Sequence, residues 1–278
     1  MDKNFKIDIL LATYNGEKYI SEQINSILDQ TYSNWNIIIR DDGSTDNTLN
    51  IIDDFVAKHP SKITILNDNK GHLNSTLSFA SLLENSQNDF IMLCDQDDVW
   101  VNNKIELTLK VMIEFVNQFG DIPLMVFTDL KEVDEELNII SESFIKSQKL
   151  DPTIINNATK LAAMNVVAGC TTMINKKAIK YILPIHSKNI IHDQWMAVNI
   201  AKYGKIKFID LTTILYRQHS KNALGSYNIR ISYFLKKIMD PNRQLMIYRD
   251  LLTGLNFKIN LFSFAFYKLY FSIKRLIN

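Results

Sequence analysis

The sequence is poor in cysteine and in long apolar runs. Its two cysteines, Cys94 and Cys170, lie within or beside apolar residues, so a disulfide framework is excluded and buried thiols in a cytosolic chain are expected. No uncharged apolar stretch reaches the about 18 residues that a transmembrane helix needs. The apolar segment 7–12 is too short for a signal peptide, and no small-residue cleavage site follows it.

Length and charge suggest one large domain with an appendage. The chain has 278 residues, of which 46% are hydrophobic, which is enough for a sizeable core. Its net charge of +1 conceals an asymmetry, because residues 221–278 contain ten Lys or Arg against two acids, and 11 of the 29 aromatic residues. By subtraction, residues 1–220 contain 21 basic and 28 acidic side chains. We therefore expect different roles for the acidic body and the basic, aromatic tail.

Apolar runs alternate with helical patterns through the first half of the chain. Strands are predicted at residues 7–12, 36–40, 63–66, 89–94 and 124–129. Helices are predicted at residues 20–28, 49–56, 75–86 and 104–116. Continuous apolar strands separated by helices indicate an α/β fold with a mostly parallel sheet.

The second half is less regular. Residues 131–165 are polar and mixed, and no repeat, low-complexity tract or proline-rich linker occurs. The pattern predicts a bent strand at 167–174, a helix at 192–204, two short strands at 205–210 and 212–219, and helices from about 227 to the end.

Three polar clusters directly follow predicted strands. They are Thr13-Tyr14-Asn15, Asp41-Asp42-Gly43-Ser44 and Asp95-Gln96-Asp97-Asp98. In an open α/β sheet ligands bind beyond the carboxyl ends of the strands, so the three clusters indicate one site.

The acidic clusters favour a metal-bridged diphosphate. No GxGxxG or GxxxxGK motif is present, so a glycine loop does not cradle phosphates. A Mg²⁺ or Mn²⁺ ion could instead bridge carboxylates and the phosphates of a nucleotide, and would explain three aspartates at the end of a buried strand. The alternative is that these aspartates only end the strand and cap the next helix, for which one would suffice.

Six motifs occur in a consistent order over about residues 5–225. They are LATYNGEKYISEQINSILDQTY, RDDGSTDNT, DQDDVW, VAGC, HDQW and YRQH. Together they resemble nucleotide-sugar-dependent glycosyltransferases of family 2, which have the GT-A fold. DQDDVW followed by Lys104, with HDQW and YRQH, resembles the bacterial rhamnosyltransferase-like branch.

The resemblance implies both domains and site residues. It implies a catalytic domain at 1–225, with a nucleotide-sugar half of about 1–130 and an acceptor half of about 131–225, and a helical region at 226–278. The implied nucleotide-sugar ligands are Thr13, Tyr14, Asn15, Glu17, Asp41, Asp42, Asp95, Gln96, Asp98, Trp100 and Arg217. The implied metal ligands are Asp95, Asp97 and His219, and the implied acceptor-side residues are Gly169, Cys170, His192 and Trp195.

Three of these assignments carry further detail. Asp193 matches the catalytic base of the family. Either Asp41 or Asp42 would bind the pyrimidine base, with Asp42 favoured. His192 would orient or tune Asp193, or would cap its helix.

The chemistry of sugar transfer suits these residue types. A carboxylate takes the proton of the acceptor hydroxyl, and a divalent cation stabilises charge on the leaving diphosphate. One base and no candidate nucleophile imply single displacement with inversion. The QxxRW motif of processive synthases is absent, which favours addition of one or a few sugars.

The implied activity is transfer of rhamnose from dTDP-rhamnose to a saccharide or lipid-linked saccharide in bacterial surface polysaccharide synthesis. A UDP-hexose or UDP-N-acetylhexosamine donor is an alternative within the same fold. A nucleotidyltransferase or nucleotide-sugar hydrolase would not need Asp193, and a non-catalytic nucleotide-sugar-binding scaffold would not need the complete set of acids.

The tail carries an amphipathic pattern. Its apolar stripe, with four-three-four-three spacing, consists of Phe262, Phe266, Leu269, Ile273 and Leu276, and its other faces carry Phe264, Tyr267, Lys268, Phe271 and Arg275. Such a helix could lie on the anionic inner face of the cell membrane, which would make the protein peripheral, or pack on the body or a partner subunit. Nucleic-acid binding is not expected, because no reading motif is present and the body is acidic.

Overall fold

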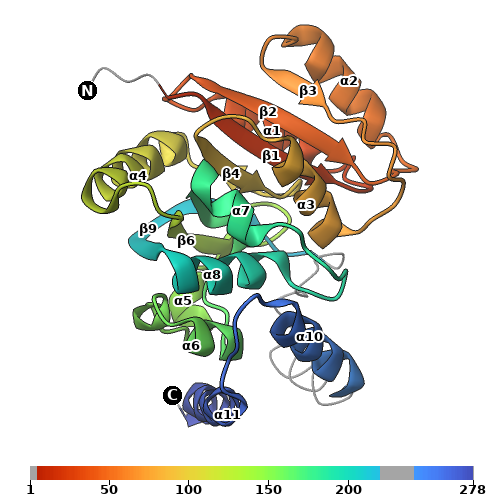
Figure 1. Ribbon diagram of the computed structural model, residues 1–278. Coiled ribbons are helices and arrows are strands. Elements are labelled where there is room, and N and C mark those ends of the chain that lie inside the picture. Colours follow the sequence, from red (N-terminus) through yellow and green to blue (C-terminus); the bar gives the residue numbers. More distant parts are fainter. Residues whose placement is uncertain (1–4, 220–240, 278) are drawn as a thin grey trace.

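A single nine-stranded sheet forms the centre of the protein in a computed structural model that describes residues 5–219 and 241–277 (Figure 1). The strand order is β3-β2-β1-β4-β8-β6-β9-β5, and β7 pairs with β6. The predicted domain boundary at residue 225 lies outside the described residues.

The strands are β1 (Ile7–Thr13), β2 (Trp35–Asp41), β3 (Ile63–Ile65), β4 (Phe90–Cys94), β5 (Val99–Trp100), β6 (Leu124–Val133), β7 (Ile139–Ser141), β8 (Thr172–Asn175) and β9 (Lys205–Arg217). The helices are α1 (Ile20–Leu28), α2 (Thr48–Lys58), α3 (Ser75–Asn85), α4 (Lys104–Phe119), α5 (Phe144–Ser147), α6 (Ala158–Ala163), α7 (Ile179–Ile182), α8 (His192–Tyr203), α10 (Pro241–Gly254) and α11 (Leu261–Ile277). Short 3₁₀ turns lie at Pro152–Ile154, Gly169–Thr171 and Lys176–Ala178.

Burial on both faces explains the continuous apolar strands. β3, β2, β1 and β4 are parallel neighbours. Within β1, Leu10 belongs to the core that includes α3, α6 and α8, whereas Ile9 and Leu11 belong to the core that includes α1 and α4. Alternating residues therefore fill two cores, and the carboxyl ends of these strands meet at one edge of the sheet.

The second half of the sheet differs from the prediction in two places. β8 is antiparallel to both β4 and β6, and it begins only at Thr172, because a 3₁₀ turn occupies Gly169–Thr171. The two predicted strands at 205–210 and 212–219 are one strand, β9, which runs parallel to β6 across shifts in register next to Asp129. Tertiary pairing with β6 carries the chain across residues whose sequence pattern indicates a break.

The last helix packs on the body with one face only. Phe271 of α11 is buried, and Lys268 Nζ donates to the Ala163 carbonyl at the end of α6, at 2.9 Å. Lys274 pairs with Asp151 at 3.0 Å, and α11 lies beside α6 (Figure 1). The alternative that the tail helix packs on the body is thus confirmed for the face that carries Phe271. The predicted apolar stripe lies on another face and is exposed along its length. No helix among the described residues is long and apolar enough to cross a membrane.

Candidate active site at the carboxyl edge of the sheet

The loop that follows β4 meets the end of β9. His219 Nε2 lies 2.9 Å from Asp97 Oδ2, although 122 residues separate them. Both side chains are largely buried. The parallel run of β9 beside β6 carries the chain to this edge, so the structure brings together two of the three predicted metal ligands.

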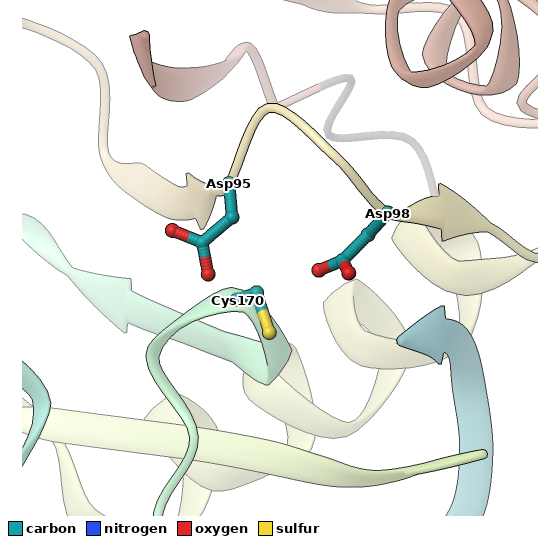
Figure 2. Close-up of side chains that lie close together, drawn as sticks. All are labelled: Asp95, Asp98 and Cys170. Carbon is teal, nitrogen blue, oxygen red and sulfur yellow. The ribbon is translucent and has the colours of Figure 1, made fainter. Parts of the chain in front are cut away.

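Asp95 and Asp98 point from the same loop towards Cys170 (Figure 2). Their ligand atoms and the Cys170 thiol all lie within 4.8 Å of one another. Burial, with the neighbouring charges of Asp97 and Asp193, raises the pKa of Asp95 to about 7. The charge of the predicted base, Asp193, therefore reaches the loop that carries the predicted metal ligands.

A buried lysine supports the loop from below. Lys104, the first residue of α4, is fully buried, and its Nζ lies 4.7 Å from the centre of the Trp100 ring without a hydrogen-bond partner in the described structure. Burial lowers the pKa of Lys104 to about 8, while the nearby Cys170, Cys94 and Asp98 oppose that shift. The positive charge of Lys104 therefore lies close to the three aspartates of the loop. The sequence suggested only a metal ion as the source of positive charge there.

Asp98 and Trp100, two of the implied nucleotide-sugar ligands, are buried in this structure. Asp98 Oδ1 accepts a hydrogen bond from the Arg217 backbone N–H at 3.2 Å. Both side chains therefore support the loop, and their contact with a nucleotide sugar stays a prediction.

Arg217 also holds the loop. Its Nε donates to the Asp97 carbonyl at 3.1 Å, and its two terminal nitrogens donate to the Glu135 carbonyl and the Glu22 carboxylate. Its guanidinium lies 4.6 Å from the centre of the Tyr19 ring. These contacts position the metal-binding loop, and a role for Arg217 at the diphosphate stays a prediction.

Gln96 clamps the loop to the end of β1. Its Oε1 accepts from the Tyr14 N–H at 2.8 Å, and its Nε2 donates to the Tyr14 carbonyl at 3.1 Å. A Cβ on Gly16 would lie 2.4 Å from Gln96 Oε1, so this clamp requires a glycine there. Gln96 therefore positions two of the predicted nucleotide-binding segments relative to each other.

Backbone bonds also fix the segment after β1 against the segment after β2. The Asn15 N–H donates to Ser44 Oγ, and Asn15 Oδ1 accepts from the Thr45 N–H, both at 2.8 Å. Glu17 accepts from the Asn47 N–H at 2.9 Å. The predicted residues around Tyr14, whose ring is half exposed, thus form one rim of the site.

Asp41 and Asp42 differ mainly in exposure, and which of them binds the base stays a prediction. Asp42 is buried and accepts bonds from Arg40, the Leu73 N–H and the Asn74 N–H. Burial opposes its ionisation, but these donors outweigh that effect and lower the pKa of Asp42. Asp41 accepts from the Thr13 hydroxyl at 2.9 Å, from the Gly43 and Ser44 N–H groups and from the Ser44 hydroxyl, yet it stays partly exposed at the edge, which favours Asp41 over the residue preferred from the sequence.

Asp193 lies in the first turn of α8, at the other side of the site. Its Oδ1 accepts from the Gln194 N–H at 2.6 Å and from Asn165 Nδ2 at 3.0 Å. Burial raises the pKa of Asp193 to about 6, against the opposing effect of donors that include the Gly169 N–H. This carboxyl group is ionised at neutral pH and poised to accept a proton.

His192 forms a wall beside the base. The residue before it, Ile191, occupies the N-cap position of α8 and no side chain caps the helix, so the capping alternative is wrong. Its ring lies 4.5 Å from the Phe79 ring, and burial lowers the pKa of His192 to about 4, which keeps the ring neutral. A Cβ on Gly169 would lie 2.8 Å from His192 Nε2, so Gly169 leaves the space that the ring fills.

Comparison with protein families identifies this arrangement. The sequence pattern described as glycosyl transferase family 2 matches residues 8–183, more than half of the chain. The chain belongs to glycosyltransferase family 2.

Curated relatives of this family 2 glycosyltransferase have related names. It is 30% identical over 230 residues to the dTDP-rhamnosyl transferase RfbG of Shigella flexneri, an alignment that covers 78% of this chain and 74% of that protein. It is 34% identical over 116 residues to WfgD of Escherichia coli, named as a UDP-Glc:α-D-GlcNAc-diphosphoundecaprenol β-1,3-glucosyltransferase. The second alignment covers 40% of this chain and only 42% of WfgD.

Solved structures show that the glycosyltransferase has the GT-A fold. S. aureus TarS in complex with UDP-GlcNAc superposes with a TM-score of 0.54 at 20% identity, covering 78% of this chain and 60% of that one. The mannosyltransferase PcManGT of Pyrobaculum calidifontis, with GDP-Man and Mn²⁺, superposes with a TM-score of 0.57 at 14% identity, covering 90% and 69%. These identities are low, so the likeness establishes the fold alone.

The donor set of the glycosyltransferase fits a divalent cation. Carboxylate oxygens and a neutral imidazole are ligands that Mn²⁺ accepts readily, and carboxylates suit Mg²⁺. Ligands of one octahedral ion with bonds of about 2.1 Å lie about 3 Å apart, close to the separation of Asp97 Oδ2 and His219 Nε2. The residues therefore suit such an ion.

Two residues assigned to the acceptor side are buried. Cys170 lies beside Asp95 and Asp98 (Figure 2), and its contact with an acceptor stays a prediction. Trp195 is buried, with its Nε1 donating to the Ile182 carbonyl at 2.6 Å and its ring against Gly254. The prediction that Trp195 faces the acceptor is therefore wrong for this geometry. Asn165, which binds the base, was missed, because nothing in the local sequence distinguishes it from an ordinary loop asparagine.

Proposed function

We propose that the protein is an inverting, metal-dependent glycosyltransferase that moves a sugar from a nucleotide donor to a saccharide acceptor. The observation that carries the proposal is the closeness of Asp193 to the acidic loop. A Cβ on Gly169 would lie 3.5 Å from Asp193 Cβ, and the next residue, Cys170, has its thiol within 4.8 Å of the Asp95 carboxylate. A base beside a diphosphate-binding loop is what single displacement requires.

The residues divide the work of the reaction. Asp95, Asp97 and His219 would hold the cation, which stabilises negative charge on the departing diphosphate. Asp193 takes the proton of the acceptor hydroxyl on the face opposite that diphosphate. The neutral His192 ring and its Phe79 partner form the apolar side of the acceptor pocket and limit the water around the base.

The favoured donor is dTDP-rhamnose. It is supported by the name of the Shigella relative and by that alignment's cover of most of both chains. The name of the Escherichia coli relative supports the alternative, a UDP-sugar donor, over a shorter alignment. A non-catalytic scaffold would not need the donors that hold Asp193, so we favour catalysis.

The acceptor is proposed to be a lipid-linked saccharide in surface polysaccharide synthesis, reached at the cytoplasmic face of the membrane. The support is the exposed stripe of α11, which includes Phe262, Phe266 and Leu269. Residues 221–278 contain ten basic and two acidic side chains, a net charge of +8, which favours binding to an anionic bilayer.

A thermal-shift panel tests the donor site. It compares dTDP, UDP and GDP and their sugars, each with Mn²⁺ or with a chelator. A nucleotide at a hundredfold excess over its Kd adds about 2.7 kcal/mol of stability. We expect a Mn²⁺-dependent rise in Tm for dTDP and dTDP-rhamnose. A rise with UDP-sugars alone would replace the rhamnosyl donor, and no rise with any nucleotide would contradict the proposed function.

The Asp97→Ala variant assigns the metal. Losing one carboxylate ligand should remove the Mn²⁺-dependent part of the Tm rise, because His219 and Asp95 alone hold the cation weakly. Asp54→Ala is the matched control, since Asp54 is exposed on α2 and its loss removes the same charge. Equal Mn²⁺-dependent shifts in both variants would exclude Asp97 as a ligand.

A further inference from the structure

Asn165 presents a rigid donor to the candidate base. Its Nδ2 donates to Asp193 Oδ1 at 3.0 Å and to the Val167 carbonyl at 2.9 Å. Its Oδ1 accepts from the Val167 N–H at 3.1 Å. One amide side chain thus makes three bonds, of which two bind its own loop and the third reaches the base.

The two bonds to Val167 determine which end of the amide faces Asp193. Because Oδ1 is occupied by the Val167 N–H, the NH₂ group must lie on the side of the carboxylate. A rotated amide would lose both loop bonds and would place its oxygen against a carboxylate oxygen. The arrangement therefore favours an ionised Asp193 in one orientation.

The loop that carries Asn165 is tied to the helix that carries the base. Gln194, the next residue after Asp193, donates through Nε2 to the Leu161 carbonyl at 3.0 Å and the Ala162 carbonyl at 2.9 Å. These bonds join the end of α6 to the first turn of α8. Asn165 lies three residues beyond Ala162, so donor and acceptor sit on one connected frame.

Two of the bonds to Asp193 reach the same oxygen. Both Asn165 and the Gln194 N–H donate to Oδ1. Two donors at one oxygen fix the rotation of the carboxylate about its Cβ–Cγ bond. Neither of them contacts Oδ2, which is therefore the oxygen better placed to take the proton of an acceptor hydroxyl, while the Gly169 N–H adds to the preference for the ionised group.

We propose that Asn165 is the positioning residue of the acceptor-activating base, which fixes the Asp193 carboxylate so that Oδ2 takes the proton. This inference rests on the proposed function, since it assigns a task within that reaction. Asn165 itself touches neither sugar nor diphosphate. A purely structural role, as a loop turn that shapes residues 165–167, is the competing explanation.

The test compares Asn165→Ala with a matched control, Asn157→Ala. Asn157 caps the start of α6 through its Oδ1, which accepts from the Lys160 N–H at 3.0 Å. Its loss removes a comparable hydrogen bond at the opposite end of the same helix from Asn165. Both variants are assayed for release of dTDP from dTDP-rhamnose with Mn²⁺ and water as acceptor, for Tm, and for the dTDP-dependent Tm shift.

We expect Asn165→Ala to lower kcat on the order of tenfold or more, with KM and the dTDP shift unchanged, because only the orientation of the base is disturbed. The acidic limb of its pH–rate profile should move to higher pH, since a donor to the ionised carboxylate is lost. Asp95 and His192, which also face Asp193, are the same in every variant. Asn157→Ala should keep the kcat and the pH limb of the unmodified protein.

Asn165→Asp provides a second variant that keeps the acceptor for the Val167 N–H but loses the bond to the Val167 carbonyl. It cannot donate to Asp193 and adds a like charge, so kcat should fall further than in Asn165→Ala. Unchanged kcat and pH limb in both Asn165 variants, or losses no larger than in Asn157→Ala, would overturn the inference. If the unmodified protein releases no nucleotide from dTDP-rhamnose or a UDP-sugar, the proposed function fails with it.

Discussion

At the scale of single residues, opposing effects set the proton affinity of Asp193. Burial disfavours its ionised form, and three donors from Gln194, Gly169 and Asn165 favour that form, with a resulting pKa of about 6. The same burial also keeps His192 neutral, with a pKa of about 4. At neutral pH the site therefore offers an ionised Asp193 carboxylate next to a neutral His192 imidazole.

This pKa predicts how the rate depends on pH. A base works only when ionised, so nucleotide release should fall as pH drops through about 6 and should level off above it. A bound Mn²⁺ near Asp95 would move the limb to lower pH, because a nearby positive charge favours the carboxylate. A rate with Mn²⁺ that shows no acidic limb anywhere in the pH range in which the protein stays folded would contradict the assignment.

Replacement of the base supplies the matching test. Asp193→Asn keeps the size of the side chain and should still bind dTDP in the thermal-shift assay, since the nucleotide contacts lie elsewhere. Its turnover should fall by a factor on the order of a hundred or more, and the pH limb should disappear. Near-normal turnover would remove Asp193 as the base.

At the scale of elements, Gly169 and His192 form an interlocking pair between the 3₁₀ turn and α8. A Cβ at Gly169 would lie 2.8 Å from His192 Nε2. Gly169→Ala should therefore destabilise the fold by about 1–3 kcal/mol, as overpacked sites do. His192→Ala opens that space, so the double variant should lose less stability than the sum of the two single losses. Additive losses in denaturant unfolding would show that the two residues do not compete for space.

The elements also show how far sequence patterns reach. β1, β2 and β4 were predicted to within one residue, because burial on both faces leaves an unbroken apolar run. β9 was predicted as two strands, because its exposed Leu211 and polar neighbours interrupt the pattern and only pairing with β6 continues it. Local periodicity records burial, and it contains no information about a partner strand.

The candidate site divides in the same way. The closeness of Asp97 and His219 could be expected only because the resemblance to family 2 makes both of them metal ligands. Two other contacts of the site depend on segments far apart in the chain. The buried Asp98 supports the acidic loop, and Asn165 donates to the candidate base Asp193. Their residue types occur in any loop, so the sequence alone cannot distinguish them.

At the scale of the whole molecule, the C-terminal helix has two apolar faces. One packs on the body through Phe264, Tyr267 and Phe271. The other exposes Phe262, Phe266 and the rest of its stripe, while Lys268 and Lys274 on α11 contact the body. If α11 binds a membrane as proposed, its outward apolar face would make the contact, and Lys268 and Lys274 would contribute less charge than the composition of the tail suggests.

This division predicts how membrane binding responds to substitution. The triple variant Phe262→Ser, Phe266→Ser, Leu269→Ser should fold normally, because these side chains are exposed, and should lose binding to phosphatidylglycerol vesicles by tenfold or more. Ile139→Ser with Leu211→Ser is the matched control, since it removes exposed apolar side chains from β7 and β9. Vesicle co-sedimentation at low and high salt separates the apolar from the electrostatic contribution to binding, and the apolar contribution should survive high salt.

If the triple variant sediments as well as the control, the outward face does not contact the bilayer. If instead the unmodified protein forms a dimer that the triple variant lacks, the face binds a second copy of the chain.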